Sequence, residues 1–391
     1  MSAKLRILVV HNRYRQRGGE DAVAEDEVAL LRERGHEVAL YARDNSELDR
    51  IGPLEASAQA LWSRRTTAEI ADLCARFRAD LVHAHNTFAL VSPSLYWATF
   101  RARVPVVQTL HNYRLMCVQG MFLRGNRVCE DCLGHVPWRG VLRRCYHGSA
   151  MESAALAGVV TVHRMIGTFR GRVTRYIALN EFCRRKFIEG GLPAGRIAVK
   201  PNFVDVPPPP EAAREGALFV GRLSEEKGVA TLLGALERAR GTRVEVVGTG
   251  PEAARLASHS RVRAHGWLGP AQVFERMRAA AFLVLPSVWF ECFPRTLVEA
   301  FACGLPVIAS RVGALEELVE HGRTGLLFRP GSAKSLARAL DYAQTHPDLM
   351  REMGANARTA YEKHFSPQRN YEQLMVIYDD ALGAFEARAA A

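Results

Sequence analysis

The feature that most constrains the fold of this 391-residue chain is an alternation of short apolar runs with amphipathic segments. An apolar run at residues 5–10 is followed by an amphipathic segment from Glu20 to Arg34 and by a second apolar run at 36–42. Strand, helix and strand at this spacing form a parallel crossover unit. Further strands of the same sheet are predicted at 81–84, 104–110 and 176–179.

The alternation starts again after four consecutive prolines, Pro207 to Pro210, which form a stiff extended connector. The sequence therefore predicts the α/β fold class, with two doubly wound Rossmann-like domains. Ligands of such sheets bind at the carboxyl ends of the strands, which would face a central cleft. The expected strands of the second domain are 217–220, 243–247, 262–264, 281–285, 306–309 and 325–328, and its expected helices include 229–239, 335–344, 347–364 and 368–388.

The positive charge of the chain is concentrated in one quarter of its length. Residues 101–200 hold 17 Lys and Arg against 5 Asp and Glu, whereas the whole chain carries a net charge of +11. Such a surface suits an anionic membrane, an anionic acceptor or nucleic acid. Few aromatic residues lie among the arginines and no binding motif is recognisable, so nucleic acid is not the expected partner.

Membrane spanning and secretion are not expected. The least charged stretch, 81–100, contains Asn86, Pro93 and two histidines, which makes it a poor bilayer helix. The apolar run behind Lys4 and Arg6 is too short for the core of a signal peptide. We expect a protein that is either free in the cytoplasm or peripheral on the inner face of the cell membrane.

Four of the eight cysteines cluster, and they are a candidate metal site. In a cytosolic chain such a cluster indicates a metal before a disulfide. The tight Cys-x2-Cys pair fits one edge of a tetrahedral zinc site, and four thiolates would make that site structural. His135 and His147 are alternative ligands, and a set of reduced, partly buried thiols is the alternative interpretation. The predicted ligands are Cys117, Cys129, Cys132 and Cys145.

A candidate phosphate site follows the strand that ends near Pro286. Pro294 suits the first turn of a helix, and the free N–H groups and dipole of a helix start bind phosphate. Glu299 lies five residues later, about 7.5 Å along the helix, which is a sensible distance from a diphosphate to its ribose. Glu291 precedes the helix on the other side of the phosphate, where a sugar would lie.

These motifs together resemble the family 4 retaining glycosyltransferases of the GT-B fold. The resemblance rests on two glutamates separated by seven residues in FECFPRTLVEA (290–300), on the FACGLPVIAS run that follows, and on Gly221–Gly228, Val247–Pro251 and the Gly18-Gly19 pair. It spans most of the chain. One departure is that many members have glycines where this chain has Cys292 and Pro294, and Pro294 offers no N–H donor.

The resemblance implies a role for each matching residue. Arg222 and Lys227 would neutralise the donor diphosphate, Glu299 would bind the ribose and Glu291 a sugar hydroxyl. The Gly18 and Gly19 backbone would approach the donor, and His111, at the end of a strand, would lie near the reacting sugar. Backbone amides would cover phosphate and sugar along Phe293, Pro294, Arg295 and Thr296.

The predicted domains are an acceptor-binding domain (1–203) with a Cys-rich insertion near 117–145, a nucleotide-sugar-binding domain (204–366) and a C-terminal helix (367–391) that crosses back to the first domain. The predicted function is retaining transfer of a sugar from a UDP- or GDP-linked donor to a glycan, lipid or small-molecule acceptor, in cell-envelope polysaccharide, glycolipid or related synthesis. No catalytic cofactor or metal is expected, because the Asp-x-Asp triplet that holds a metal in the other glycosyltransferase class is absent. The alternatives are a nucleotide-sugar 2-epimerase of the same fold and a zinc-stabilised nucleic-acid-binding protein.

Overall fold

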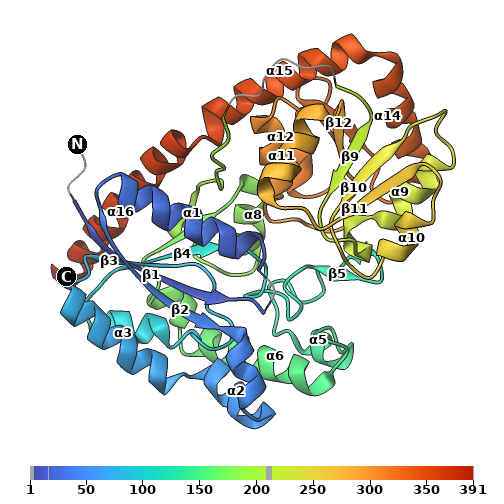
Figure 1. Ribbon diagram of the computed structural model, residues 1–391. Coiled ribbons are helices and arrows are strands. Elements are labelled where there is room, and N and C mark those ends of the chain that lie inside the picture. Colours follow the sequence, from blue (N-terminus) through green and yellow to red (C-terminus); the bar gives the residue numbers. More distant parts are fainter. Residues whose placement is uncertain (1–3, 16, 208–213, 391) are drawn as a thin grey trace. The chain divides into compact units, whose positions relative to one another are not determined.

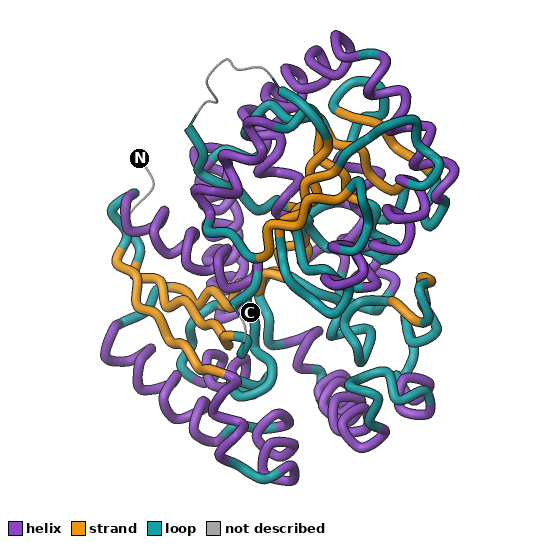
Figure 2. The backbone as a smooth tube through the Cα atoms, turned by 45° about the vertical axis from the view of Figure 1, so that its right-hand side comes forward, coloured by secondary structure: helices purple, strands orange, loops and turns teal. Residues whose placement is uncertain are grey.

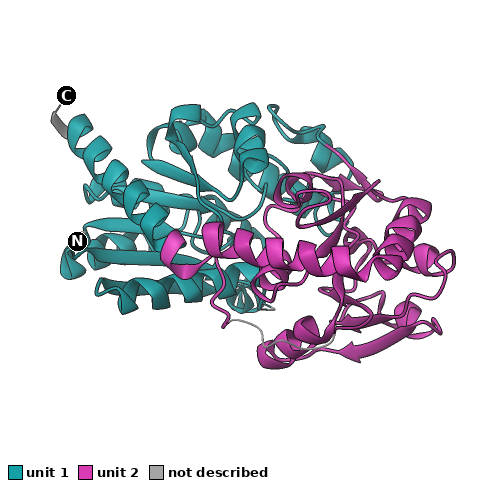
Figure 3. Cartoon of the chain, turned by 90° about the horizontal axis from the view of Figure 1, so that it is seen from above, with its two compact units in different colours: residues 1–121, 130–202, 370–391 teal, residues 122–129, 203–369 magenta. Residues whose placement is uncertain are grey.

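The computed structural model describes residues 4–15, 17–207 and 214–390, and the chain divides into two compact units (Figure 3). The first unit comprises 1–121, 130–202 and 370–391, and the second comprises 122–129 and 203–369. Of the proline connector, Pro208 to Pro210 lie outside the described residues. Helices flank both sheets (Figure 2).

The first unit is built on a six-stranded parallel sheet in the order β2-β1-β3-β4-β7-β8. The strand order reverses between β1 and β3, which places a topological switch point at their carboxyl ends. The strands of this sheet are β1 (Arg6–Arg13), β2 (Glu37–Asp44), β3 (Leu81–Ala84), β4 (Val106–Leu110), β7 (Arg175–Ala178) and β8 (Ile197–Val199).

Helices cover both faces of this sheet (Figure 1). One face carries α1 and the C-terminal helix α16, whose buried Leu374 and Tyr378 pack with Ile7 and Val9 of β1 in one core cluster. Helix α3 lies on the opposite face of the sheet. Its residues Ile70 and Cys74 are buried. The α-helices of the first unit are α1 (Gly19–Glu33), α2 (Pro53–Leu61), α3 (Arg64–Phe77), α4 (Leu95–Arg101), α5 (Trp138–Leu142), α6 (Ala150–Met165), α7 (Thr168–Gly171), α8 (Glu181–Glu189) and α16 (Pro367–Ala390), and its 3-10 turns are η1 (Asn45–Arg50) and η2 (Ala194–Arg196).

The second unit repeats the architecture with the strand order β11-β10-β9-β12-β13-β14, again all parallel. Its order reverses between β9 and β12. The strands are β9 (Ala217–Val220), β10 (Val244–Val247), β11 (Val262–Gly266), β12 (Phe282–Leu285), β13 (Val307–Ser310) and β14 (Gly325–Phe328). The helices are η3 (Glu225–Lys227), α9 (Val229–Leu236), α10 (Ala253–Ala257), α11 (Pro270–Ala279), α12 (Arg295–Ala302), α13 (Ala314–Leu318), α14 (Ala333–Thr345) and α15 (Pro347–His364).

A small hairpin from the Cys-rich segment belongs to the second unit, which the sequence did not indicate. Strands β5 (Leu123–Arg124) and β6 (Arg127–Val128) pair antiparallel. Val128 packs against the core of the second unit, and the ring of Phe122 lies 6.5 Å from that of Phe290. These apolar contacts account for the grouping of residues 122–129 with the second unit.

Among the helices in the described ranges, none combines the length and the apolar character that crossing a bilayer requires.

Candidate functional site

The switch point of the second unit is lined by closely packed loops that follow β9, β10 and β12. Gly248, at φ +138°, lies so close to the loop after β9 that a Cβ there would stand 1.9 Å from the carbonyl oxygen of Gly221. A Cβ on Gly228, at φ +77°, would stand 1.9 Å from the carbonyl oxygen of Pro286. Only glycine fits either position. The glycines of these motifs thus hold the loops that carry Arg222, Lys227 and Glu291 side by side.

Lys227 and Glu291 form an ion pair at the centre of these loops. The Lys227 ammonium donates to Oε1 of Glu291 at 2.8 Å, and the Ser287 hydroxyl donates to the same oxygen. Glu291 is 4% exposed, whereas about a quarter of the Lys227 side chain, 24%, remains exposed. The ammonium also lies 5.7 Å from the centre of the Trp289 ring. The sequence prediction that these two residues share a site is therefore consistent with their direct contact.

Arg222 lies in the same loop but is largely exposed. Its guanidinium forms an ion pair with Glu226 and donates from Nε to the Ser224 hydroxyl at 3.2 Å. Burial alone would raise the pKa of Glu226, but hydrogen bonds from Ser224 and the backbone, together with the Arg222 charge, lower it. The carboxylate is thus ionised at neutral pH and holds Arg222 beside the carboxyl end of β9.

Helix α12 begins at Arg295, with Pro294 in extended conformation as its N-cap. No side chain caps this end within the described residues, and the N–H of Leu297 donates to the carbonyl oxygen of Pro294 at 3.0 Å. Within the helix, Nε of Arg295 donates to Oε1 of Glu299 at 2.9 Å. Thr296 is half-buried, and Phe293 packs its ring 6.0 Å from that of Phe365. The helix start therefore offers backbone N–H groups at the positive end of the helix dipole.

In the first unit, Gly18 is the N-cap of α1, and its N–H donates to Oδ2 of Asp21 at 2.8 Å. A Cβ on Gly19 would meet nothing within 4 Å, so this turn offers open backbone. His111 follows β4 and is partly buried. Beside it, Asn112 donates to Oε1 of Glu20 at 3.0 Å, and the Tyr14 hydroxyl donates to the other oxygen at 2.8 Å.

His111 is one of four histidines gathered at the switch point of this sheet. Its Nε2 lies 2.9 Å from Nδ1 of His85, with the two rings stacked. The ring of His85 in turn lies 4.4 Å from that of His83 and 6.2 Å from that of His11. His11 contacts Oδ1 of Asp21 through Nε2 at 2.8 Å. Burial and the neighbouring imidazoles hold the pKa of His111 well below its usual range, so the ring is neutral at neutral pH.

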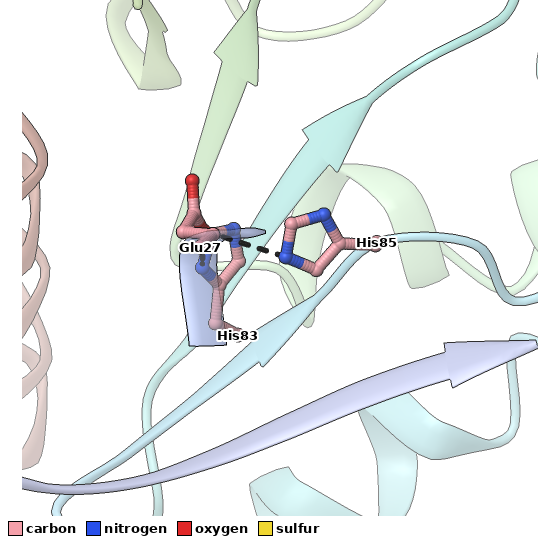
Figure 4. A group of neighbouring side chains, drawn as sticks. All are labelled: Glu27, His83 and His85. Carbon is pink, nitrogen blue, oxygen red and sulfur yellow. Dashed lines mark ion pairs between the residues drawn. The ribbon is translucent and has the colours of Figure 1, made fainter. Parts of the chain in front are cut away.

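Next to two of these histidines, His83 and His85, lies a buried carboxylate, Glu27 (Figure 4). Its Oε1 stands 2.8 Å from Nδ1 of His83 and 3.4 Å from Nε2 of His85. Its Oε2 accepts from the ammonium of Lys200 at 2.9 Å. Burial alone would raise the pKa of Glu27, but Lys200, His83 and His85 hold it well below its usual range. The carboxylate is therefore ionised inside the core.

The atoms of Glu27, His83 and His85 lie within 4.8 Å of one another, close enough in principle to hold a metal. The Lys200 ammonium on the same carboxylate makes a second cation there unfavourable, so the group is better described as a hydrogen-bonded network. Sequence reasoning missed this network. The available signals were an acid, Glu27, on the apolar face of a predicted helix and the His83-x-His85 spacing at a strand end, which places both rings on one face.

The four clustered cysteines are divided between the units: Cys129 belongs to the second, and Cys117, Cys132 and Cys145 belong to the first. No three of these thiols form a metal-sized group in the described part of the chain, so the observed geometry does not by itself close a tetrahedral shell. The structural zinc stays a prediction. We expect about one zinc ion per chain in freshly reduced protein. An elemental analysis that finds no zinc would contradict this prediction.

Comparisons with known proteins identify both halves of the chain. A family model described as Glycosyltransferase Family 4 matches residues 17–207, and one described as Glycosyl transferases group 1 matches residues 214–345. The D-inositol 3-phosphate glycosyltransferase of Gordonia bronchialis is 37% identical over 30% of this chain and 26% of its own length. The glycogen synthase of Mycobacterium tuberculosis is 28% identical over 75% of this chain and 66% of its own length. The matched regions thus span less than two thirds of these relatives.

Solved structures confirm the expected fold. Sucrose-phosphate synthase from Thermosynechococcus elongatus superimposes with a TM-score of 0.71 at 19% identity, covering 99% of this chain and 100% of that one. HepE from Anabaena, in complex with UDP-glucose, gives a TM-score of 0.65 at 19% identity, covering 96% and 100%. The matched models and the two doubly wound sheets agree: the chain joins a Glycosyltransferase Family 4 region to a Glycosyl transferases group 1 region and has the GT-B fold.

Proposed function

We propose that the protein is a retaining glycosyltransferase that moves a sugar from a nucleoside diphosphate donor to an acceptor hydroxyl. The observation that carries this proposal is the arrangement around the start of α12. Lys227 touches Glu291 there, and Glu299 lies one turn into the helix, paired with Arg295. Cations, the backbone N–H groups of a helix start and two carboxylates in this order suit a diphosphate flanked by a sugar and a ribose.

Each of the three cations at this site is held by a carboxylate of the same unit: Arg222 by Glu226, Lys227 by Glu291 and Arg295 by Glu299. A diphosphate would compete for these cations with its own charge. We propose that donor binding draws Arg222 and Lys227 onto the phosphates. Glu291 and Glu299 would then be free to accept hydrogen bonds from sugar and ribose hydroxyls. The resting ion pairs keep the cations close to the place where they are needed.

The proposed step exchanges one bond for another on the same face of the sugar. The bond between the anomeric carbon and the diphosphate oxygen breaks, and the acceptor oxygen bonds to that carbon. The acceptor proton passes to the departing diphosphate, so the anomeric configuration is kept. Lys227, Arg222 and the N–H groups of α12 would stabilise the charge that grows on the leaving oxygen, which is a preorganised electrostatic contribution.

For the donor, we propose a UDP-linked sugar, because HepE, which shares the fold, is described in complex with UDP-glucose. A GDP-linked sugar remains the second candidate from the motifs. For the acceptor, the names of the relatives suggest a polyol phosphate or a glycan. In the first unit, Glu20 and Asn112 beside His111 offer a carboxylate and an amide that would bind acceptor hydroxyls.

We also propose that the first unit rests on an anionic membrane, where lipid-linked acceptors reside. Leu142 of α5 and Met165 of α6 are 73% and 79% exposed, and Trp138 is exposed as well. Three exposed arginines, Arg139 of α5, Arg144 just after it and Arg170 of α7, would supply the charge. Cationic and apolar groups together suit the interfacial region of a bilayer.

Two other residues of this basic segment are not available to the surface. Phe169 is 3% exposed, and Arg175 is ion-paired with Asp380. Sedimentation with anionic vesicles that weakens with salt would support the membrane proposal. Equal binding to neutral vesicles, or none to either, would contradict it.

The function is tested in two steps. A panel of nucleotide sugars is first screened for thermal stabilisation, since a ligand that binds only the folded state raises its melting temperature. The stabilising donor is then incubated with candidate acceptors, and the products and their anomeric configuration are determined. Transfer with retention supports the proposal. Conversion of the donor sugar to its 2-epimer without any acceptor would support the epimerase instead, and inversion would contradict the retaining mechanism.

A further inference from the structure

We infer that a buried polar network running from Lys200 through Glu27 and His85 fixes which ring nitrogen of His111 carries hydrogen. The network is a property of the first unit. Its use in catalysis rests on the proposed sugar transfer, whereas its hydrogen-bond pattern does not. His85 and Glu27 are positioning residues in this inference, because they act through His111.

The network begins at a buried ion pair. Lys200 is 1% exposed, and its ammonium donates to Oε2 of Glu27 at 2.9 Å and to Oδ1 of Asn370 at 3.1 Å. A fully buried ammonium needs a charged partner, so Glu27 is ionised here. An ionised carboxylate can only accept hydrogen bonds. Every ring nitrogen that faces it must therefore carry hydrogen.

The second step fixes the tautomer of His85. Its Nε2 is buried, has no hydrogen-bond partner among the described residues, and faces Oε1 of Glu27 at 3.4 Å. A lone pair on this nitrogen would face a carboxylate, so Nε2 carries the hydrogen. Burial and the neighbouring His83 lower the pKa of His85 to about 4, so the ring has a single hydrogen at neutral pH. The other nitrogen, Nδ1, then offers a lone pair.

The third step fixes the tautomer of His111. Because Nδ1 of His85 can only accept, Nε2 of His111 donates to it across 2.9 Å. His111 is neutral too, so its Nδ1 is left with a lone pair. His111 thus presents a hydrogen-bond acceptor to a substrate hydroxyl and keeps its hydrogen on the side of the protein. A neutral histidine without this network would exchange between its two tautomers.

The hydrogen-bond partners of His83 are consistent with these tautomers of His85 and His111. His83 has Nδ1 2.8 Å from Glu27 and Nε2 2.8 Å from the Thr109 hydroxyl, which can donate to it. The Tyr378 hydroxyl lies 2.7 Å from Nδ1 of His83, at the end of the network away from His111. Tyr378 therefore provides a natural control position.

The test is nitrogen NMR of the histidine side chains in ¹⁵N-labelled protein without substrate, with His111 assigned by difference from His111→Gln. We expect Nε2 of His111 to be protonated and Nδ1 to be unprotonated. In His85→Phe, which keeps the ring and removes both nitrogens, we expect a mixture of the two tautomers. Tyr378→Phe should leave the His111 signals unchanged. A wild-type His111 with hydrogen on Nδ1, or no change in His85→Phe, would overturn the inference.

Should His85→Phe fail to fold, the double variant Glu27→Gln/Lys200→Met gives the same information, because it removes both buried charges together and leaves an amide that can turn either face to His85. In either variant, sugar transfer should fall in kcat by about 100-fold, with little change in the KM for the donor. If no nucleotide sugar is transferred but the NMR pattern holds, the proposed function fails and the network stands. If transfer occurs with Nδ1 of His111 protonated, the network fails and the function stands.

Discussion

Both units contain ion pairs close to their parallel sheets, but the two sets of charges differ in burial. In the first unit, Glu27 and Lys200 are almost completely buried. In the second, Arg222 keeps 63% and Lys227 keeps 24% of its side chain exposed. Buried charges that have a single arrangement are suited to holding another group in place. Exposed cations paired with carboxylates can change partners when a ligand arrives, at little cost.

This difference in burial also means that the two sites contribute differently to stability and to function. Removing one member of a buried ion pair leaves the other charge without compensation in the core. Removing an exposed cation changes stability little but takes charge away from a bound ligand. Variants of the first unit should therefore show first in unfolding measurements, and variants of the second unit in kinetics.

The largest expected effect is on the buried pair. Lys200→Met should lower the free energy of unfolding by about 3–5 kcal/mol, because Glu27 is left as an unpaired buried charge. The double variant Glu27→Gln/Lys200→Met should be much less destabilised, since no charge then remains. Urea unfolding of the full chain measures both. Equal losses in the single and double variants would show that the pair does not act as a unit.

The next effect concerns pH. The pKa of His85 is lowered to about 4, so between the unfolded value of about 6.5 and pH 4 only the unfolded chain binds this proton. The free energy of unfolding should therefore fall as the pH drops from about 6.5 to about 4, and His85 should contribute about 3 kcal/mol of this loss. Glu27, whose pKa is also depressed, adds a loss at lower pH. In His85→Phe the slope between pH 6.5 and 4 should be smaller, as measured by urea unfolding at each pH.

For the second unit, Lys227→Ala should reduce kcat/KM by about 100-fold or more, because the leaving diphosphate loses a preorganised charge. Arg222→Ala should act in the same direction. The unfolding free energy should change less than in Lys200→Met, because Lys227 is partly exposed whereas Lys200 is fully buried. Arg351→Ala is the matched control, since it removes an exposed cation paired with Asp348 in the same unit. Native rates in both Lys227→Ala and Arg222→Ala would refute the assignment of the donor site.

The smallest effect separates the two glutamates around α12. Glu299→Ala should weaken nucleoside diphosphate binding about tenfold, as expected for a lost charge-assisted hydrogen bond to the ribose. Glu291→Ala should depress turnover while leaving that binding nearly intact, because in the proposed complex Glu291 binds the sugar and not the nucleoside diphosphate. Calorimetric titration with the nucleoside diphosphate, alongside turnover, distinguishes them. Reversed behaviour of the two variants would exchange their roles.

Much of the fold could be predicted from the sequence, because parallel strands buried on both faces give continuous apolar runs. The expected strands at 81–84, 217–220 and 325–328 coincide with β3, β9 and β14. Helix α12 begins one residue after the expected start, because Pro294 serves as its N-cap. Strand β8 was missed, since three residues at the edge of a sheet carry little pattern.

The proposed donor site and the buried network differ in how far the sequence indicates them. Its residues lie in short motifs whose spacing has a local meaning, such as Glu291 and Glu299 on either side of a helix start. The network joins Glu27 of α1, His85 after β3 and Lys200 after β8, which are far apart in sequence. No local sequence pattern indicates that these residues lie close together in space. Only the packing of α1 against the sheet brings these polar groups to one place.

The central claim is that side chains and a helix start, without a metal ion, compensate the charge of the leaving diphosphate. The most direct test is the rate of sugar transfer by the wild-type protein in the presence of a chelator, compared with the rate in added magnesium. We expect the wild-type protein to transfer sugar at the same rate in the chelator and in magnesium. We also expect magnesium not to rescue Lys227→Ala. Loss of wild-type transfer in the chelator, with recovery when magnesium is restored, would contradict it.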